Sequence, residues 1–105
     1  MNMMFGQGEF QEGQKRYTGE IVLSEHKLFL TLSHEELAET FIPLEQIHGI
    51  KRNSQGLLIR YGTGVLTRHN VIVRGDRKNI SGLIQEIAKR RGLKKRFLVE
   101  EWVEV

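Results

Sequence analysis

The sequence contains no cysteine, only one proline, and no apolar run longer than a few residues. Without cysteine the chain has no disulfide, no thiol nucleophile and no thiolate metal site. The short apolar runs exclude a transmembrane helix, which needs about 20 mostly apolar residues. The first residues, MNMMFGQGEF, lack the charged and apolar regions of a signal peptide. We therefore expect a cytoplasmic protein.

The residue patterns that catalysis needs are missing as well. Four histidines are scattered along the chain, and no two of them have the HxH or HxxxH spacing of zinc ligands. No serine lies in a GxSxG motif, and the glycine pairs lack the context of a phosphate-binding loop. His69 alternates with Val71 and Val73 and is predicted to lie at the edge of the core. We expect no enzyme activity, no cofactor and no metal.

A chain of 105 residues, 39% hydrophobic and 28% charged, is typical of a single soluble domain with one core. Its net charge of +3 conceals an asymmetry. Residues 1–50 contain eight acidic and three basic residues, whereas residues 51–105 contain thirteen basic and five acidic residues. This distribution indicates either an anionic partner or an electrostatic match between segments of the same domain.

Most of the chain has the alternation and the β-branched content of strands. The first two strands are separated by the tight turn Glu25–His26 and form a predicted β-hairpin. Because the gaps between strands are too short for a helical crossover, we expect about seven antiparallel strands in a curved sheet. The clearest strand segments are Tyr17–Ser24, Lys27–Leu32, Thr40–Leu44, Ile47–Arg52, Leu57–Tyr61 and Val65–Arg74.

Two segments leave alternatives open. Residues 1–16 are rich in glycine and glutamine and are interpreted as a flexible N-terminal lead or an irregular first strand. In residues 33–39, Ser33 and Glu36 have the spacing of a capping box, which indicates either one helical turn or a loop. Pro43 favours a sheet edge or a strand end, because proline cannot donate to a strand ladder.

The only long helical pattern spans residues 76–91. Its apolar residues recur every three or four positions, with Asp76 as the expected N-cap, basic residues at the C-terminal end and Gly92 as a left-handed C-cap. The sequence therefore predicts a mainly β protein with one C-terminal α-helix. We expect a curved antiparallel sandwich or partly open barrel that this helix caps, formed by residues 17–92. The helix is expected to be the last element of the domain.

Three segments carry a resemblance to a known family: GEIVLSEHKLFL at 19–30, FIPLEQIHGI at 41–50 and ISGLIQEIAKR at 80–90. In this order they resemble the pleckstrin-homology-like domains, including the GRAM and bacterial branches. The first segment also resembles one module of the archaeal chemotaxis adaptor family CheF. The resemblance implies a sandwich capped by the helix and a non-catalytic, adaptor-type function linked to archaeal taxis signalling.

A basic surface is the first candidate binding site. If the alternation holds, cations of three strands share one face and could bind phosphate groups or an acidic protein surface. The alternative is an ordinary solvated face of a half-buried sheet. Nucleic acid is not expected, because the basic half has few aromatic residues for base stacking. The predicted basic face consists of Lys51, Arg52, Arg60, Arg68 and Arg74.

The tail, residues 93–105, changes from basic to apolar and favours an extra strand. This strand either folds back on its own sheet or joins the sheet edge of another chain, and we predict a homodimer through Phe97, Val99, Trp102 and Val103. The expected function is a protein-interaction module with a partner of unknown identity. The alternative is a peripheral binder of anionic lipids through the basic face and tail. A third, weaker alternative is a small-ligand binder or an enzyme that uses an apolar barrel mouth.

Overall fold

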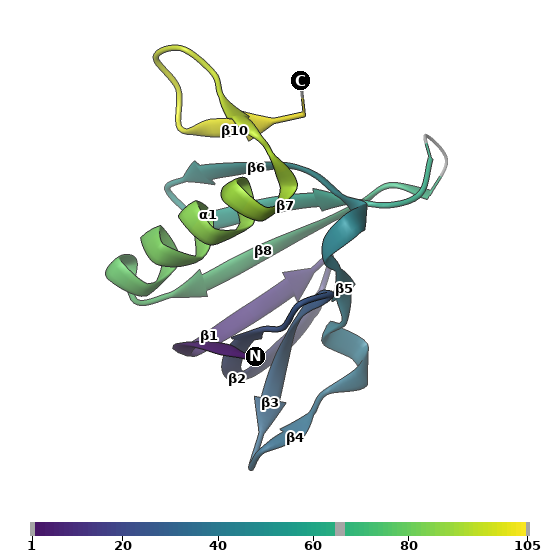
Figure 1. The fold of residues 1–105 in the computed structure, drawn as a ribbon. Coiled ribbons are helices and arrows are strands. Elements are labelled where there is room, and N and C mark those ends of the chain that lie inside the picture. The colour runs from purple at the N-terminus through teal and green to yellow at the C-terminus, as the bar shows by residue number, and fades with distance from the viewer. Residues whose placement is uncertain (1, 65–66, 105) are drawn as a thin grey trace.

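The computed structural model describes residues 2–64 and 67–104, which form a twisted antiparallel sheet and one α-helix (Figure 1). The strands lie in the order β4-β3-β2-β1-β8-β7-β6-β10-β9, and β5 also pairs with β3. Two 3-10 helices, η1 (Ala38–Thr40) and η2 (Leu44–Gln46), flank β5. The strands are β1 (Met3–Glu12), β2 (Lys15–Leu23), β3 (Lys27–Leu32), β4 (Glu35–Glu36), β5 (Ile42–Pro43), β6 (Ile47–Asn53), β7 (Gly56–Tyr61), β8 (His69–Gly75), β9 (Lys94–Lys95) and β10 (Glu101–Val103).

This architecture confirms the predicted fold class. The sheet is antiparallel and does not close into a barrel, and the single α-helix packs on it, which is consistent with a pleckstrin-homology-like sandwich capped by a helix. The predicted strand Val65–Arg74 begins at residues outside the described part of the chain, and β8 starts at His69. Pro43 ends the two-residue strand β5, as its missing N–H favours. Within the described residues, no helix is long and apolar enough to cross a bilayer.

The flexible lead predicted for residues 1–16 is wrong, and the alternative of an irregular first strand is right. β1 is central in the sheet, between β2 and β8. Phe5 and Phe10 are both buried, although an odd spacing would put them on opposite faces of a regular strand. The register shift between Met4 and Gln7, with Gly6 at φ 77°, is a β-bulge that brings both rings to the core face.

The capping box predicted at Ser33 and Glu36 does not form a helical turn. Ser33 and His34 have φ values of 54° and 69°, and Leu32 pairs with Glu35, so the segment is a two-residue hairpin turn between β3 and β4. An N-cap residue requires an extended backbone, which Ser33 does not have.

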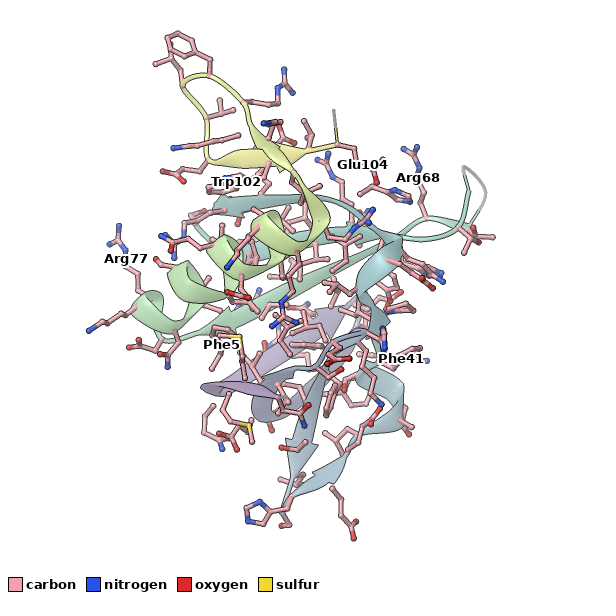
Figure 2. All side chains as sticks on the ribbon, viewed as in Figure 1. Phe5, Phe41, Arg68, Arg77, Trp102 and Glu104 are labelled. Carbon is pink, nitrogen blue, oxygen red and sulfur yellow. The ribbon has the colours of Figure 1, made fainter. Side chains whose placement is uncertain are left out.

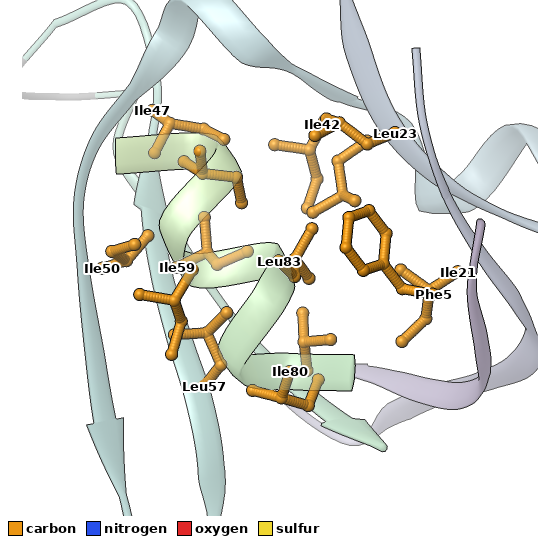
Figure 3. Packing of buried hydrophobic residues seen from close by; sticks show 14 of the residues in the cluster. Phe5, Ile21, Leu23, Ile42, Ile47, Ile50, Leu57, Ile59, Ile80 and Leu83 are labelled. Atoms are coloured by element: carbon orange, nitrogen blue, oxygen red, sulfur yellow. The ribbon is translucent and has the colours of Figure 1, made fainter. Parts of the chain in front are cut away.

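Helix α1 (Arg77–Arg91) fulfils its prediction at both ends and along its buried side. The Asp76 carboxylate accepts hydrogen bonds from the amides of Lys78 and Asn79, both at 3.1 Å, and Gly92 adopts φ 64° as the C-cap. Figure 3 shows the helix between two parts of the core, with Leu83 facing Phe5. The buried stripe consists of Ile80, Leu83, Ile84, Ile87 and Ala88.

The helix is not the last element of the domain, contrary to the prediction. After Gly92 the buried Leu93 packs in the core cluster, and the chain continues as β9 and β10. β10 pairs with β6, so residues 101–103 fold back on their own sheet. The tail thus covers the edge that β6 would otherwise expose, which is one way in which proteins protect sheet edges.

Candidate functional site

Strand register decides which of the predicted basic residues share a face. Arg60 pairs with Asn70 and Lys51 pairs with Leu58, on the side of the sheet opposite the buried Ile59. Arg74 lies on this outer face as well, because it alternates with the buried Val73 of β8. Arg68 is exposed in the connection before β8. Four of the five predicted residues therefore belong to the outer face or its rim.

Arg52 does not belong to this face, which corrects the prediction. It follows Lys51 in β6 and therefore points to the helix side of the sheet. Its Nη2 donates to the backbone oxygen of Arg77 at 3.1 Å and to Ser81 Oγ at 2.9 Å. Arg52 thus ties the first turn of α1 to the sheet.

Ion pairs neutralise much of the outer face. Arg74 Nη1 lies 2.7 Å from Glu9 Oε2, and Arg60 Nη1 lies 3.3 Å from Glu101 Oε2. Glu9 belongs to the acidic half of the sequence and Arg74 to the basic half, so part of the charge asymmetry is an internal match between neighbouring strands. The outer face is therefore a weak candidate for binding an anion.

The C-terminal hairpin, which we define as residues 94–103, is tied to the sheet by buried and polar contacts. The amide of Arg52 donates to the Glu100 carbonyl at 2.8 Å, beyond the three residue pairs of β6 and β10. Glu101 is 8% exposed and bonds both Arg60 and Arg96. Trp102 packs against the core cluster, and Lys95 Nζ lies 5.6 Å from its ring centroid. The base of the hairpin is thus held by the domain.

The tip of this hairpin is different from its base. Phe97 is 88% exposed and Leu98 is 86% exposed, and Val99 beside them is also exposed. Leu98 adopts φ 65°, a left-handed conformation that is unusual for leucine. The three residues before Phe97 are the exposed cations Lys94, Lys95 and Arg96, of which Arg96 lies 3.1 Å from Glu101 and Lys95 lies 3.9 Å from Glu100. Figure 1 shows the hairpin extending away from the body of the domain. The tip therefore combines exposed apolar side chains with adjacent positive charge.

Glu104 fastens the other end of β10. Its Oε1 lies 3.0 Å from His48 Nδ1 and 3.1 Å from Arg91 Nη2, and its backbone amide donates to the His48 carbonyl at 3.3 Å. The hydrogen bond from His48 is the main cause that holds the pKa of Glu104 below its usual value of 4.5. His48 Nε2 also lies 2.7 Å from the Gly62 carbonyl. Both ring nitrogens of His48 thus contact oxygen atoms, one of Glu104 and one of the backbone.

A second group of polar side chains meets where β1 and β7 end and β8 begins. Tyr61 Oη lies 3.2 Å from Glu12, and His69 stacks on Tyr61 and lies 3.2 Å from the same carboxylate. Burial, with Glu12 as a further cause, raises the pKa of Tyr61 to about 12, so the phenol stays protonated at neutral pH. Among the described residues no group of three potential ligands could hold a metal ion. His69 was predicted at the edge of the core, but it is exposed and reaches the core only through its stacking on Tyr61.

The predicted self-association surface is divided by the structure. Trp102 and Val103 belong to β10 and pair with Ile50 and Gly49 of their own chain, so they do not provide a free strand for a partner. Within one chain the tail takes the first of the two predicted alternatives, folding back on its own sheet, and strand exchange with a second chain stays a prediction. Phe97 and Val99 remain exposed at the tip. A homodimer through the tip stays a prediction.

A cleft at the end of the sheet where β6 turns into β7 was missed by the sequence reasoning. It has a volume of about 440 Å³ and lies between the β6–β7 turn, the end of β8 and the first turn of α1. Arg52 and Arg74, which the sequence predicted as parts of one face, line it from two sides together with Arg77. The signal in the sequence that could have indicated this cleft is the position of Arg77, which is the first residue of the helix that follows a strand. The cleft depends on contacts between distant segments, which periodicity does not show.

Comparisons of the chain with family models, with curated proteins and with solved structures found no match. The resemblances to pleckstrin-homology-like domains and to the chemotaxis adaptor module therefore stay predictions.

Proposed function

We propose that the chain is a non-catalytic module that docks peripherally on anionic membrane surfaces through the tip of its C-terminal hairpin. The observation that carries this proposal is the exposure of Phe97 and Leu98 directly after three consecutive cations. Exposed apolar side chains on a projecting, anchored hairpin fit an apolar environment outside the molecule. Cations beside them fit the phosphates and carboxylates of anionic headgroups.

The magnitudes predict reversible docking. Burying one large apolar side chain contributes about 1.5–3 kcal/mol, and Phe97 and Leu98 offer two. Each Lys or Arg near an anionic surface adds about 1 kcal/mol. Association costs several kcal/mol of lost motion, so the remaining affinity is modest and depends on salt. Such a module attaches and detaches as the composition of the membrane changes.

The partner predicted from the sequence was a protein that binds the charged face or an edge strand. The outer face is partly neutralised by Glu9 and Glu101, and β10 already covers the edge of β6. Two hairpin cations are paired as well, Arg96 with Glu101 and Lys95 with Glu100. The exposed side chains of Phe97 and Leu98 therefore favour the hairpin tip over both of those surfaces. Its projecting apolar side chains suit a deformable bilayer, which needs no matching pocket.

Co-sedimentation with vesicles tests the proposal. Wild-type protein should bind vesicles of phosphatidylcholine and phosphatidylserine more tightly than vesicles of phosphatidylcholine alone. Binding should weaken with salt, because the Debye length falls from about 10 Å at 0.1 M to about 3 Å at 1 M. The double variant Phe97→Ser, Leu98→Ser should lose most of the binding.

Leu32→Ser is the matched control. Leu32 is 58% exposed in the β3–β4 hairpin, but its neighbours include Glu35 and Glu36 instead of cations. This variant should bind vesicles as the wild type does. Vesicle binding that survives in the tip variant would overturn the proposal. If the wild-type protein does not bind vesicles, the tip is instead assigned as a contact surface for a protein partner or for a second copy of the chain.

A further inference from the structure

The cleft between the β6–β7 turn and the start of α1 is lined largely by cations and turn residues. Three arginines surround it, and the turn residues Asn53, Ser54, Gln55 and Gly56 contribute polar side chains and backbone. No carboxylate belongs to its lining. The larger cleft near the C-terminal end of α1, about 520 Å³, is lined by Glu25 and Glu45 as well as by two arginines. Of these two clefts, the one lined by the three arginines is therefore the better candidate for binding an anion.

One acid next to the cleft is engaged elsewhere, and another pairs with a cleft residue. Asp76 directs its carboxylate to the amides of Lys78 and Asn79, whereas Glu9 pairs with Nη1 of the lining residue Arg74 and offsets part of its charge. Arg52 uses Nη2 for its bonds to α1, and Arg74 uses Nη1, so each keeps other N–H groups.

Arg77 is the cation of the cleft that has no fixed partner. Its side chain is exposed and forms no hydrogen bond or ion pair with the described residues. Figure 2 shows it projecting outward from the start of α1.

The cleft and the hairpin tip lie at the same end of the domain. Arg52 connects them, since its backbone amide bonds Glu100 in the hairpin and its side chain bonds the first turn of α1. In Figure 1 the β6–β7 turn, the start of α1 and the hairpin tip face the same side of the molecule. A surface that contacts the tip would therefore also lie near the cleft.

From this juxtaposition we infer that the cleft binds the phosphomonoester headgroup of an anionic lipid while the tip enters the bilayer. A phosphomonoester presents several oxygens with a charge near −2, which suits guanidinium groups that donate paired hydrogen bonds. The volume lies within the range of small-molecule sites, about 300–1,000 Å³. Gly56 at φ 137° leaves the turn without a side chain next to Arg74.

This inference rests on the proposed membrane docking and gives it a lipid preference. A carboxylate-bearing headgroup such as phosphatidylserine offers only a phosphodiester and one carboxylate. Phosphatidic acid offers the phosphomonoester itself. Arg77 acts as a specificity residue, while the cations of the hairpin provide attraction to any anionic surface.

The test compares two sets of vesicles matched in surface charge, one with phosphatidic acid and one with phosphatidylserine. Wild-type protein should prefer phosphatidic acid by about tenfold, which corresponds to one charge-assisted hydrogen bond. Arg77→Gln should remove this preference and change binding to phosphatidylserine little. Gln55→Glu, which puts a carboxylate into the cleft, should do the same.

Lys78→Gln is the matched control, because Lys78 is an exposed cation of the same helical turn that does not line the cleft. It should keep the preference. If Arg77→Gln and Lys78→Gln lose the preference for phosphatidic acid equally, the inference is overturned, and the preference arises from the overall positive charge of the helix start. Wild-type protein that binds both sets of vesicles equally would also overturn the inference. The proposed docking would still stand in that case, provided that the tip variant Phe97→Ser, Leu98→Ser loses its vesicle binding. Inorganic phosphate at micromolar concentration that abolishes the preference would assign the cleft to a soluble phosphate instead of a lipid.

Discussion

The sheet carries a hairpin at each end of its strand order, β3–β4 on one side and β9–β10 on the other. Both present exposed apolar residues, Leu32 in the first and Phe97 with Leu98 in the second. Glu35 and Glu36 form β4, whereas Lys94 and Lys95 form β9. The same type of element thus ends the sheet with opposite charge.

The tips also share an unusual backbone. Among the described residues, the non-glycine positions with left-handed φ are Ser33, His34 and Leu98, and all three lie in these hairpin tips. The comparison teaches that apolar exposure alone does not distinguish a docking site, because both tips have it. Charge sign and the number of apolar residues distinguish the basic hairpin, and they give the molecule one end suited to an anionic surface.

The largest expected effect concerns the anchoring of the basic hairpin. Trp102→Ala should lower the free energy of unfolding by about 2 kcal/mol, less than the roughly 3–5 kcal/mol of a fully buried aromatic residue, because Trp102 is only partly buried. Urea denaturation measures this loss. The substitution Phe97→Ala should change stability by less than about 0.5 kcal/mol, as is typical of surface positions. Equal losses at both positions would mean that the tip contributes to folding.

One substitution made in both hairpins sharpens the comparison. Glu101→Gln should cost about 1 kcal/mol, because this buried carboxylate bonds Arg60 and Arg96, whose own exposure screens the pairs. Glu36→Gln should cost less than about 0.5 kcal/mol, since its pair with Lys27 is at the surface. Thermal unfolding of the two variants measures the difference. A larger loss of stability in Glu36→Gln than in Glu101→Gln would mean that β3–β4, and not β9–β10, is the hairpin held more firmly by its ion pairs.

The smallest expected effect is the acid sensitivity of the Glu104 anchor. In the unfolded chain Glu104 binds a proton near its usual pKa of 4.5, whereas in the folded chain it does so at lower pH. The anchor therefore stabilises the fold above about pH 4.5 and is lost as pH falls through the lowered pKa.

The stability difference between wild type and Glu104→Gln should accordingly be present at pH 7 and shrink in acid. Hydrogen exchange at the β10 amides would locate this effect in the basic hairpin. A difference that is the same at both pH values would contradict the role of the charge.

Local pattern was sufficient where one element determines its own structure. The helix caps at Asp76 and Gly92 follow from the conformational preferences of these residues, and the buried stripe follows from the helical period. The first β-hairpin was likewise predictable from two alternating segments around a short turn. In β1 the pattern failed, because the bulge at Gly6 changes the face of every residue after it.

The candidate site was predictable only in part. The basic and apolar character of the tail is visible in the sequence, as are the cations Arg52 and Arg74. Their division between two faces was not visible, because one residue of register decides the face. The exposure of Phe97 and the burial of Trp102 also depend on where β10 finds a partner strand.

The sequence by itself determined the elements and the charge that each one carries, since short-range sterics and side-chain type act within a few residues. The tertiary structure alone decided which charges are neutralised, as in the pair of Arg74 with Glu9, and which stay available. It also brought Arg52, Arg74 and Arg77 together at one cleft. The physical reason is that ion pairing, strand pairing and burial depend on distances in space between segments that are far apart in the chain.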